Sequence, residues 1–190
     1  MFNRFTKDAR DVVQEAVRYA EEARAQTVGP EHLLLALLDR EGSRGSFALR
    51  ALGVLGAGGR GDAVRQALAE ARRRAGLSQA EADALAGLGI DVSEIVARVE
   101  ETHGVGAMSG DRKDRRWWSG HRSFGKGAKE ALEQALRVAV DRRDRWIGDE
   151  HILLALTVRP GVPAEVLADH GVTYESLTRV LGGDSGEACA

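Results

Sequence analysis

The chain has 190 residues, of which 43% are hydrophobic and 29% charged, and its formal net charge is −2. This length suffices for one domain with a buried core, and the small net charge disfavours a bulk nucleic-acid binder. The single cysteine, Cys189, excludes an intrachain disulfide and a cysteine-based metal cluster. The sequence has no signal-peptide core and no run of about 18 apolar residues, so we expect a cytoplasmic protein without a membrane segment.

An internal duplication organises the chain. The segment Gly29–Leu35 (GPEHLLL) returns 119 positions later as Gly148–Leu154 (GDEHILL). The same shift superimposes Phe5 on Phe124, Ala9 on Ala128, Ala16 on Ala135, Ala20 on Ala139 and Val28 on Ile147. Each copy is too small to bury its own apolar face, which predicts that the two copies pack into one pseudo-symmetric domain.

An apolar stripe predicts a helix at the start of the first copy, and Thr6 is its expected N-cap. The stripe consists of Ala9, Val12, Val13, Ala16, Val17, Ala20 and Ala23. A second, leucine-rich helix is expected over 31–39 and a third over 46–52. Gly53 then suits a left-handed helix end.

The region after the third helix has no counterpart in the second copy. A glycine-rich loop over 56–61 precedes an arginine-rich helix over 62–75, and Ser78 is expected to cap another short helix. The step Leu88-Gly89-Ile90 then repeats Leu52-Gly53-Val54, so we assign the next helix, 91–102, as the fourth of the first repeat. The first repeat would thus span 1–103, with an insertion at about 55–89.

Residues 104–123 form a basic linker that contains Trp117 and Trp118. The two tryptophans are interpreted as packing over the junction between the copies, with a protein partner as the alternative and stacking on single-stranded nucleic acid as the weakest one. Nucleic acid is therefore not an expected partner.

The second repeat is expected over 124–181, followed by a disordered tail over 182–190. Its helices are predicted over 128–139, 150–157, 163–170 and 173–181. Gly125 replaces the capping threonine of the first copy, and Asp149 suits the N-cap of the second of these helices. Because no stretch shows strand periodicity, we predict an all-α fold of two tandem four-helix repeats related by a pseudo-two-fold axis.

Two motifs carry a family resemblance. They are Met1-Phe2-x-Arg4-Phe5-Thr6-x-x-Ala9 and the doubled Gly-x-Glu-His-[Leu/Ile]-Leu-Leu-Ala-Leu. Together they resemble the N-terminal domain of Clp ATPases, and the ClpC branch is the most similar. The resemblance implies a double helical repeat that recruits adaptors and substrates for an ATP-driven unfoldase and that, in ClpC, binds phosphoarginine. No G-x-x-x-x-G-K-[ST] occurs, so we expect a stand-alone, non-catalytic domain that uses no cofactor and does not turn over ATP.

The resemblance also implies a ligand site. Glu31 and Glu150 correspond to the family glutamates that hold the guanidinium group of phosphoarginine, and Thr6 corresponds to a hydroxyl beside the phosphoryl group. A carboxylate suits a guanidinium, and a helix start suits a phosphoryl group. Because Gly125 stands where a second hydroxyl would be, we expect binding chiefly in the first copy, by Thr6 and Glu31. The alternative is that both glutamates only complement the helix dipole.

Three phenylalanines are candidates for a partner groove. In the resembling domains the region of Phe2, Phe5 and Phe124 forms an inter-repeat groove where adaptors and peptide antibiotics dock. The alternative is core packing, with Phe2 the most exposed of the three.

Two other motifs invite chemistry that we do not expect. His32 and His151 follow the glutamates, but neighbouring helix residues diverge by about 100° and no second ligand follows at i+4, which favours structural histidines bonded to backbone over a metal site. The G-x-G-x-x-G pattern of Gly56–Gly61 lacks a preceding strand and is interpreted as a loop rather than a dinucleotide site.

The leading functional hypothesis is a protein-recognition module that binds substrates or adaptors for a Clp protease system, or in competition with it. The alternative is a protection protein that sequesters small molecules directed at Clp N-terminal domains. No catalytic triad and no paired carboxylates in a cleft context argue for an enzyme.

Overall fold

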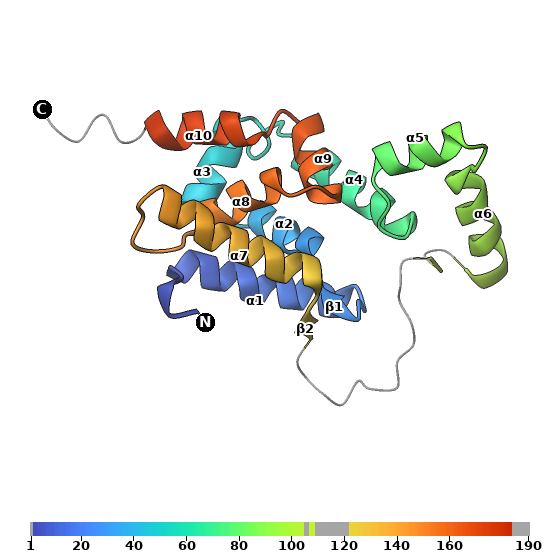
Figure 1. Ribbon diagram of the computed structural model, residues 1–190, viewed down its shortest axis with the longest axis horizontal. Helices are drawn as coiled ribbons and strands as arrows, with labels where there is room; N and C mark the ends of the chain where they lie inside the picture. Colours follow the sequence, from blue (N-terminus) through green and yellow to red (C-terminus); the bar gives the residue numbers. More distant parts are fainter. Residues whose placement is uncertain (1, 105–106, 109–121, 184–190) are drawn as a thin grey trace, which may run out of the picture.

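The computed structural model describes residues 2–104, 107–108 and 122–183, which form an almost entirely helical structure (Figure 1). After a short 3₁₀ helix, η1 (Phe2–Arg4), the helices are α1 (Lys7–Glu22), α2 (Pro30–Leu38), α3 (Arg44–Ala51), α4 (Gly61–Arg73), α5 (Gln79–Gly87), α6 (Val92–His103), α7 (Lys126–Asp141), α8 (Asp149–Val158), α9 (Val162–Asp169) and α10 (Tyr174–Gly183). Two-residue strands β1 (Thr27–Val28) and β2 (Ser123–Phe124) complete the fold. The predicted all-α class is confirmed, whereas the expectations for Trp117, Trp118 and the tail beyond Gly183 lie outside the described residues.

The helices repeat in two sets with matching contacts. Helix α1 packs against α2 as α7 packs against α8, and α2 and α8 also contact each other. Across the two sets, α3 packs on α8 while α9 packs on α2. These reciprocal contacts are those expected of two pseudo-symmetric helical units that share one core.

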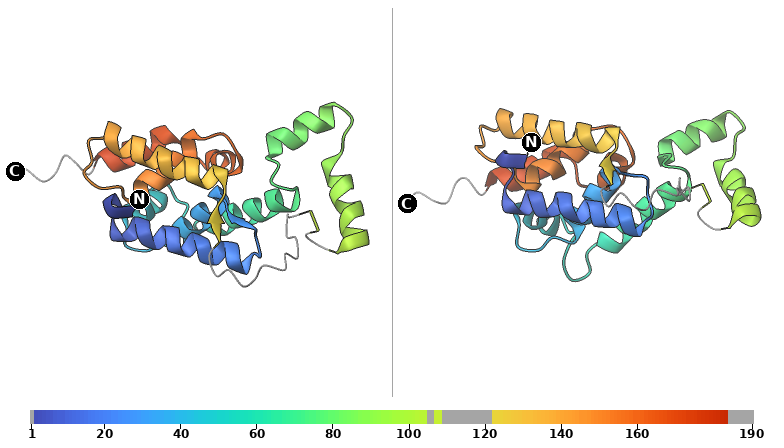
Figure 2. Two further views of the ribbon diagram at one scale, coloured as in Figure 1. Left: turned by 60° about the horizontal axis from the view of Figure 1, so that its bottom comes forward. Right: turned by 90° about the horizontal axis from the view of Figure 1, so that it is seen from below.

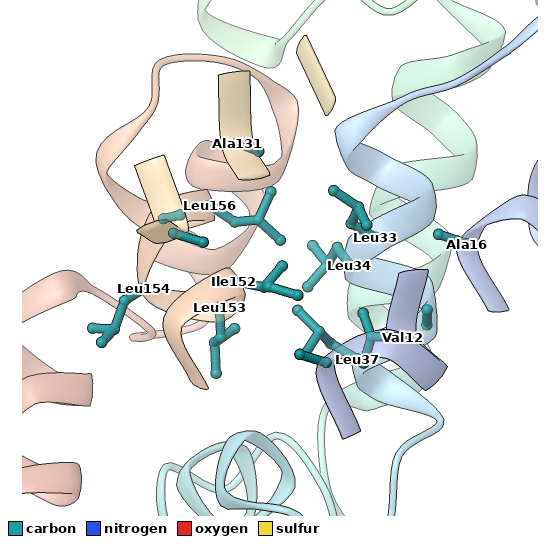
Figure 3. Packing of buried hydrophobic residues seen from close by; sticks show 14 of the residues in the cluster. Val12, Ala16, Leu33, Leu34, Leu37, Ala131, Ile152, Leu153, Leu154 and Leu156 are labelled. Carbon is teal, nitrogen blue, oxygen red and sulfur yellow. The ribbon is translucent and has the colours of Figure 1, made fainter. Parts of the chain in front are cut away.

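The core lies between the two leucine-rich helices. The side chains of α2 and α8 meet there, as Figure 3 shows for Leu34, Leu37 and Ile152. Leu33, Leu153, Leu154 and Leu156 of the same two helices are also buried. The outer helices contribute small residues with no exposed surface, namely Ala9, Ala16, Ala20, Ala128, Ala131 and Ala135. Alanine stripes let α1 and α7 approach closely while leucine supplies the buried apolar area.

The fourth helix of the first repeat is α4, and the assignment of 91–102 to that position was wrong. Helix α4 packs on α9 as α10 packs on α3. Val64 and Leu68 of α4 are buried in the core, with the same four-residue spacing as Leu177 and Leu181 of α10. We infer that the glycine-rich loop only lengthens the connection into this helix, and that α5 and α6 are the segment added to the repeat.

Helices α5 and α6 project from the end of α4, away from the other helices (Figure 2). They pack against each other as a helical hairpin. Ser78 caps α5 and Asp91 caps α6, as the sequence predicts, because their side chains accept hydrogen bonds from first-turn N–H groups. In the described part of the chain, no single helix is long and apolar enough to cross a bilayer; α8 and α9 reach that length and composition only as a pair bent by 95°.

Candidate functional site

The leading segment of each repeat lies against the other repeat. Strand β2 of the second repeat pairs in parallel with β1 of the first, and the Gly125 N–H donates to the Val28 carbonyl at 2.9 Å. Phe5 of the first repeat bridges to Ile147 of the second in the same way, and the Thr6 N–H donates to the Ile147 carbonyl at 2.9 Å. Thr6 therefore lies at the start of α8 rather than at the start of α2.

The two motif histidines bond to backbone, as predicted. His32 Nδ1 accepts from the Gly29 N–H and His151 Nδ1 accepts from the Gly148 N–H, both at 2.9 Å. Each histidine thus satisfies one of the N–H groups that a helix start leaves unpaired. His151 Nε2 also lies 2.9 Å from a carboxylate oxygen of Asp144. Burial lowers the pKa of His151, although the hydrogen bond to Asp144 opposes this shift.

Both motif glutamates fold back over the glycine two positions before them. A Cβ atom at Gly29 would lie 2.1 Å from a carboxylate oxygen of Glu31, and one at Gly148 would lie 1.9 Å from an oxygen of Glu150. Any other residue would push the carboxylate away. The glycine of the Gly-x-Glu-His motif therefore holds open the space that the glutamate occupies.

Glu150 lines a hollow of about 270 Å³, which we call the Thr6 hollow after the threonine on its other side. Arg44 and Trp146 also line it. Arg44 Nη1 lies 3.3 Å from Glu150 Oε1, and the Glu150 side chain is only 7% exposed. Burial raises the pKa of Glu150 to about 7, helped by the charge of Asp149 and opposed by a hydrogen bond from its own backbone N–H and by Arg44.

Asp149 does not cap α8, contrary to the prediction. It is the first residue of the helix, after Gly148, and its buried carboxylate reaches α3 instead. One carboxylate oxygen accepts from Ser43 Oγ at 2.5 Å and from the Gly45 N–H at 3.2 Å. These bonds fix the start of α3, and with it Arg44, beside the start of α8.

A second hollow, of about 370 Å³, opens at the start of α2, and we call it the Glu31 hollow. Arg72 and Arg159 line it together with Glu31, whose side chain is 37% exposed, and with a largely apolar wall. In place of Arg44, Val162 is the first residue of the adjoining helix, α9. The repeat symmetry places Gly125, which has no hydroxyl, where the other hollow has Thr6.

The expected pairing of Thr6 with Glu31 was therefore wrong. The structure brings Thr6 together with Glu150, because the leading segments are exchanged between the repeats. Arg44 and Trp146 were not foreseen as site residues. Arg44 follows Ser43, whose side chain accepts from the Ser46 N–H, and this capping pattern would have placed Arg44 at a helix start.

Of the three candidate phenylalanines, the two whose side chains the structure describes, Phe5 and Phe124, pack against the core. Phe5 is 7% exposed and belongs to the core, which is the alternative that the sequence left open. Phe124 is partly buried and packs against the same core. The prediction for the side chain of Phe2 lies outside the described part of the structure.

The reciprocal contacts and exchanged strands define a double helical-repeat domain. The family model of the Clp repeat N-terminal domain matches residues 4–76 and 123–187, and the chain belongs to this family. The first matched segment ends just after α4, which agrees with α4 as the fourth helix of its repeat. Membership indicates a Clp-related protein-interaction module.

Two solved structures share the fold. The N-terminal domain of the caseinolytic protease associated chaperone ClpD from Arabidopsis thaliana is 20% identical, with a TM-score of 0.52, over 97% of this chain and 99% of that one. A chain from structural investigations of a malarial protein secretion system is 13% identical, with a TM-score of 0.62, over 98% of this chain and 97% of that one. At these identities the likeness concerns the fold alone.

Proposed function

We propose that this domain recognises protein ligands of a Clp unfoldase system, as in the ClpC branch, and that the Thr6 hollow binds phosphorylated arginine side chains. The observation that carries the proposal is that Thr6, Arg44 and Glu150 line one hollow at the starts of three helices, α1, α3 and α8. Hydroxyl, cation and carboxylate match the separate parts of one zwitterionic ligand.

The hydroxyl, the cation and the carboxylate named above suit phosphoarginine in a defined direction. Glu150 offers a carboxylate to the planar guanidinium group, which can donate two parallel hydrogen bonds to such a partner. Thr6 lines the same hollow as the N-cap of α1, and a helix start favours a phosphoryl group. Arg44 now pairs with Glu150, and an incoming guanidinium would free it to pair with the phosphoryl oxygens. A bound cation would also stabilise the ionised form of Glu150, whose pKa burial raises.

The Glu31 hollow has a carboxylate and two arginines, Arg72 and Arg159, but it has no hydroxyl at the N-cap position and no arginine at the start of the adjoining helix. Gly125 and Val162 stand in those places. We therefore expect one strong site, the Thr6 hollow. The expected asymmetry between the repeats is kept, but the glutamate proposed to bind the ligand is Glu150 instead of Glu31.

Calorimetry with free phosphoarginine tests the proposal, with arginine and phosphoserine as ligand controls. Glu150→Gln should weaken binding by about ten- to a hundredfold, the worth of one charge-assisted hydrogen bond of roughly 1.5–3 kcal/mol. The matched variant Glu31→Gln should leave the affinity within about threefold of the wild type. Equal effects of the two variants would show that the transfer of ligand residues from the family has failed.

Variants of Thr6 separate ligand contact from helix capping. Thr6 Oγ1 caps α1 by accepting from the Ala9 N–H at 3.2 Å, and aspartate is at least as good an N-cap as threonine. Thr6→Asp should therefore keep the fold while its charge repels the phosphoryl group and abolishes binding. Thr6→Ser should retain both the cap of α1 and the binding of phosphoarginine. Binding that survives Thr6→Asp unchanged would place the phosphoryl group elsewhere.

The same titration separates the alternative function. A Clp-directed cyclic peptide that binds tightly while phosphoarginine does not would favour a protection protein that sequesters small molecules. Whether the domain delivers its ligands to an unfoldase or competes for them is then decided by adding it to a Clp degradation assay, where delivery speeds proteolysis and competition slows it.

A further inference from the structure

The α5–α6 hairpin projects from the body of the domain through defined contacts, and neither segment matched by the family model covers it. At its base, Arg73 of α4 donates two hydrogen bonds to Glu100 of α6, at 3.1 and 2.6 Å. The Ala80 N–H donates to Glu165 Oε1 of α9 at 3.0 Å. These contacts from two helices of the body fix both helices of the projection, which we call the arm (Figures 1 and 2).

The arm exposes large apolar side chains. Val92 and Val96 are buried, but Leu88 is 79% exposed, Ile90 42% and Ile95 44%. Leu88 and Ile90 flank Gly89, whose φ of +81° turns the chain sharply at the tip of the arm. Single exposed leucines are common on protein surfaces, whereas several apolar side chains gathered on one small two-helix unit mark an interaction site.

The arm as a whole is acidic. Residues 79–103 hold six carboxylates and one arginine, so the arm has a formal charge of −5 in a chain whose total is −2. The carboxylates are those of Glu81, Asp83, Asp91, Glu94, Glu100 and Glu101. Glu100 pairs with Arg73 of the body, and Glu94 pairs with Arg98. The remaining charge repels nucleic acid, an anionic bilayer and a second copy of the arm.

We propose that the arm docks a basic amphipathic helix of a partner protein. The apolar face of that helix would cover Leu88, Ile90 and Ile95, and its lysines and arginines would face the exposed carboxylates of Asp83, Asp91 and Glu94. This surface is separate from the Thr6 hollow, so the proposal does not depend on phosphoarginine binding.

Fluorescence anisotropy with a labelled synthetic amphipathic helix of leucine and lysine tests the arm. We expect saturable one-to-one binding that weakens as salt rises, and no binding of the matched peptide in which glutamate replaces lysine. The double variant Leu88→Ser with Ile90→Ser should weaken binding at least tenfold, because both side chains lose apolar area that the complex would bury. Phe47→Ser, which removes an exposed apolar side chain of α3, should leave the affinity unchanged.

A charge reversal gives a second measurement that does not touch the apolar tip. Glu94 is 59% exposed, so Glu94→Lys should fold normally, weaken the lysine peptide and reduce the salt dependence of its binding. Affinity that neither this variant nor the double serine variant changes would overturn the proposal.

Two further results would replace the partner with another occupant, and either would overturn the proposal. If Trp117→Ser with Trp118→Ser raises the affinity for the lysine peptide at least tenfold, the basic linker of the same chain covers the arm. If the wild type dimerises in analytical ultracentrifugation and the double serine variant is a monomer, a second copy covers it.

Discussion

Replacing Glu150 by glutamine should stabilise the protein at alkaline pH while it removes the proposed ligand contact. Burial raises the pKa of Glu150 from 4.5 to about 7, so the folded protein binds a proton that the unfolded chain releases between these values. The stabilisation that comes from this proton is fully present below about pH 4.5 and is lost as the pH rises through about 7. The ionised carboxylate then remains in a poorly hydrated position, and glutamine keeps its shape without its charge.

The magnitude follows from the shift. The rise of the Glu150 pKa from 4.5 to about 7 corresponds to about 3 kcal/mol at pH 8.5, and to about 1 kcal/mol at pH 5, where the unfolded side chain is already mostly ionised. The stability of Glu150→Gln relative to the wild type should therefore rise by about 2 kcal/mol between pH 5 and pH 8.5. The packing of the glutamine amide affects stability equally at both pH values, so subtracting the result at pH 5 from that at pH 8.5 removes this contribution.

Urea denaturation of the wild type and of Glu150→Gln at both pH values measures this change. Glu31→Gln is the matched control, because Glu31 is 37% exposed and its ionised form keeps more contact with water. If the stability difference between Glu150→Gln and the wild type were the same at pH 5 and pH 8.5, burial would not hold the proton on Glu150 and the reasoning would be refuted.

Four other substitutions test the packing, all by thermal denaturation. Gly45→Ala should destabilise the protein by about 1–3 kcal/mol, because its Cβ would lie 2.5 Å from the Asp149 carboxylate that joins α8 to α3, and an unchanged melting temperature would contradict this. Leu68→Ala and Leu181→Ala should each cost about 2–5 kcal/mol, whereas Ile95→Ala should stay within about 0.5 kcal/mol. If Ile95→Ala destabilised the protein as much as Leu68→Ala, α6 rather than α4 could be the fourth helix of the repeat.

The helices and their ends could be predicted from the sequence because the information is local. The stripe from Ala9 to Ala23 has the helical period, Thr6 and Ser78 cap within three residues, and the shift of 119 positions aligns both copies. The fourth helix of the first repeat could also have been found. Val64 and Leu68 have the spacing of Leu177 and Leu181. However, Leu88-Gly89-Ile90 resembles Leu52-Gly53-Val54, and this similarity favoured α6 as the fourth helix.

The partner of Thr6 could not be predicted from the sequence. Strands of two residues, such as β1 and β2, are too short to show a period, and the two copies offer nearly equivalent strand positions at Val28 and Ile147. Nothing local says whether Phe5 and Thr6 join their own repeat or the other one. That choice decides which glutamate faces the hydroxyl, so the composition of the site depends on tertiary structure.

The exchange of leading segments also means that neither half of this protein is a complete folding unit. Val28 and Phe5 both belong to the first half of the chain. Val28 pairs with Phe124, and Phe5 pairs with Ile147, so each needs the second half as its partner. A polypeptide cut between residues 104 and 122 should therefore stay associated as two complementary fragments. Lengthening the connection between the halves costs little stability, because the entropy of closing a loop grows only with the logarithm of its length. A domain interlocked in this way can carry a long segment between its halves, and the two helices of the arm contribute no residue to the core cluster of the described part of the chain.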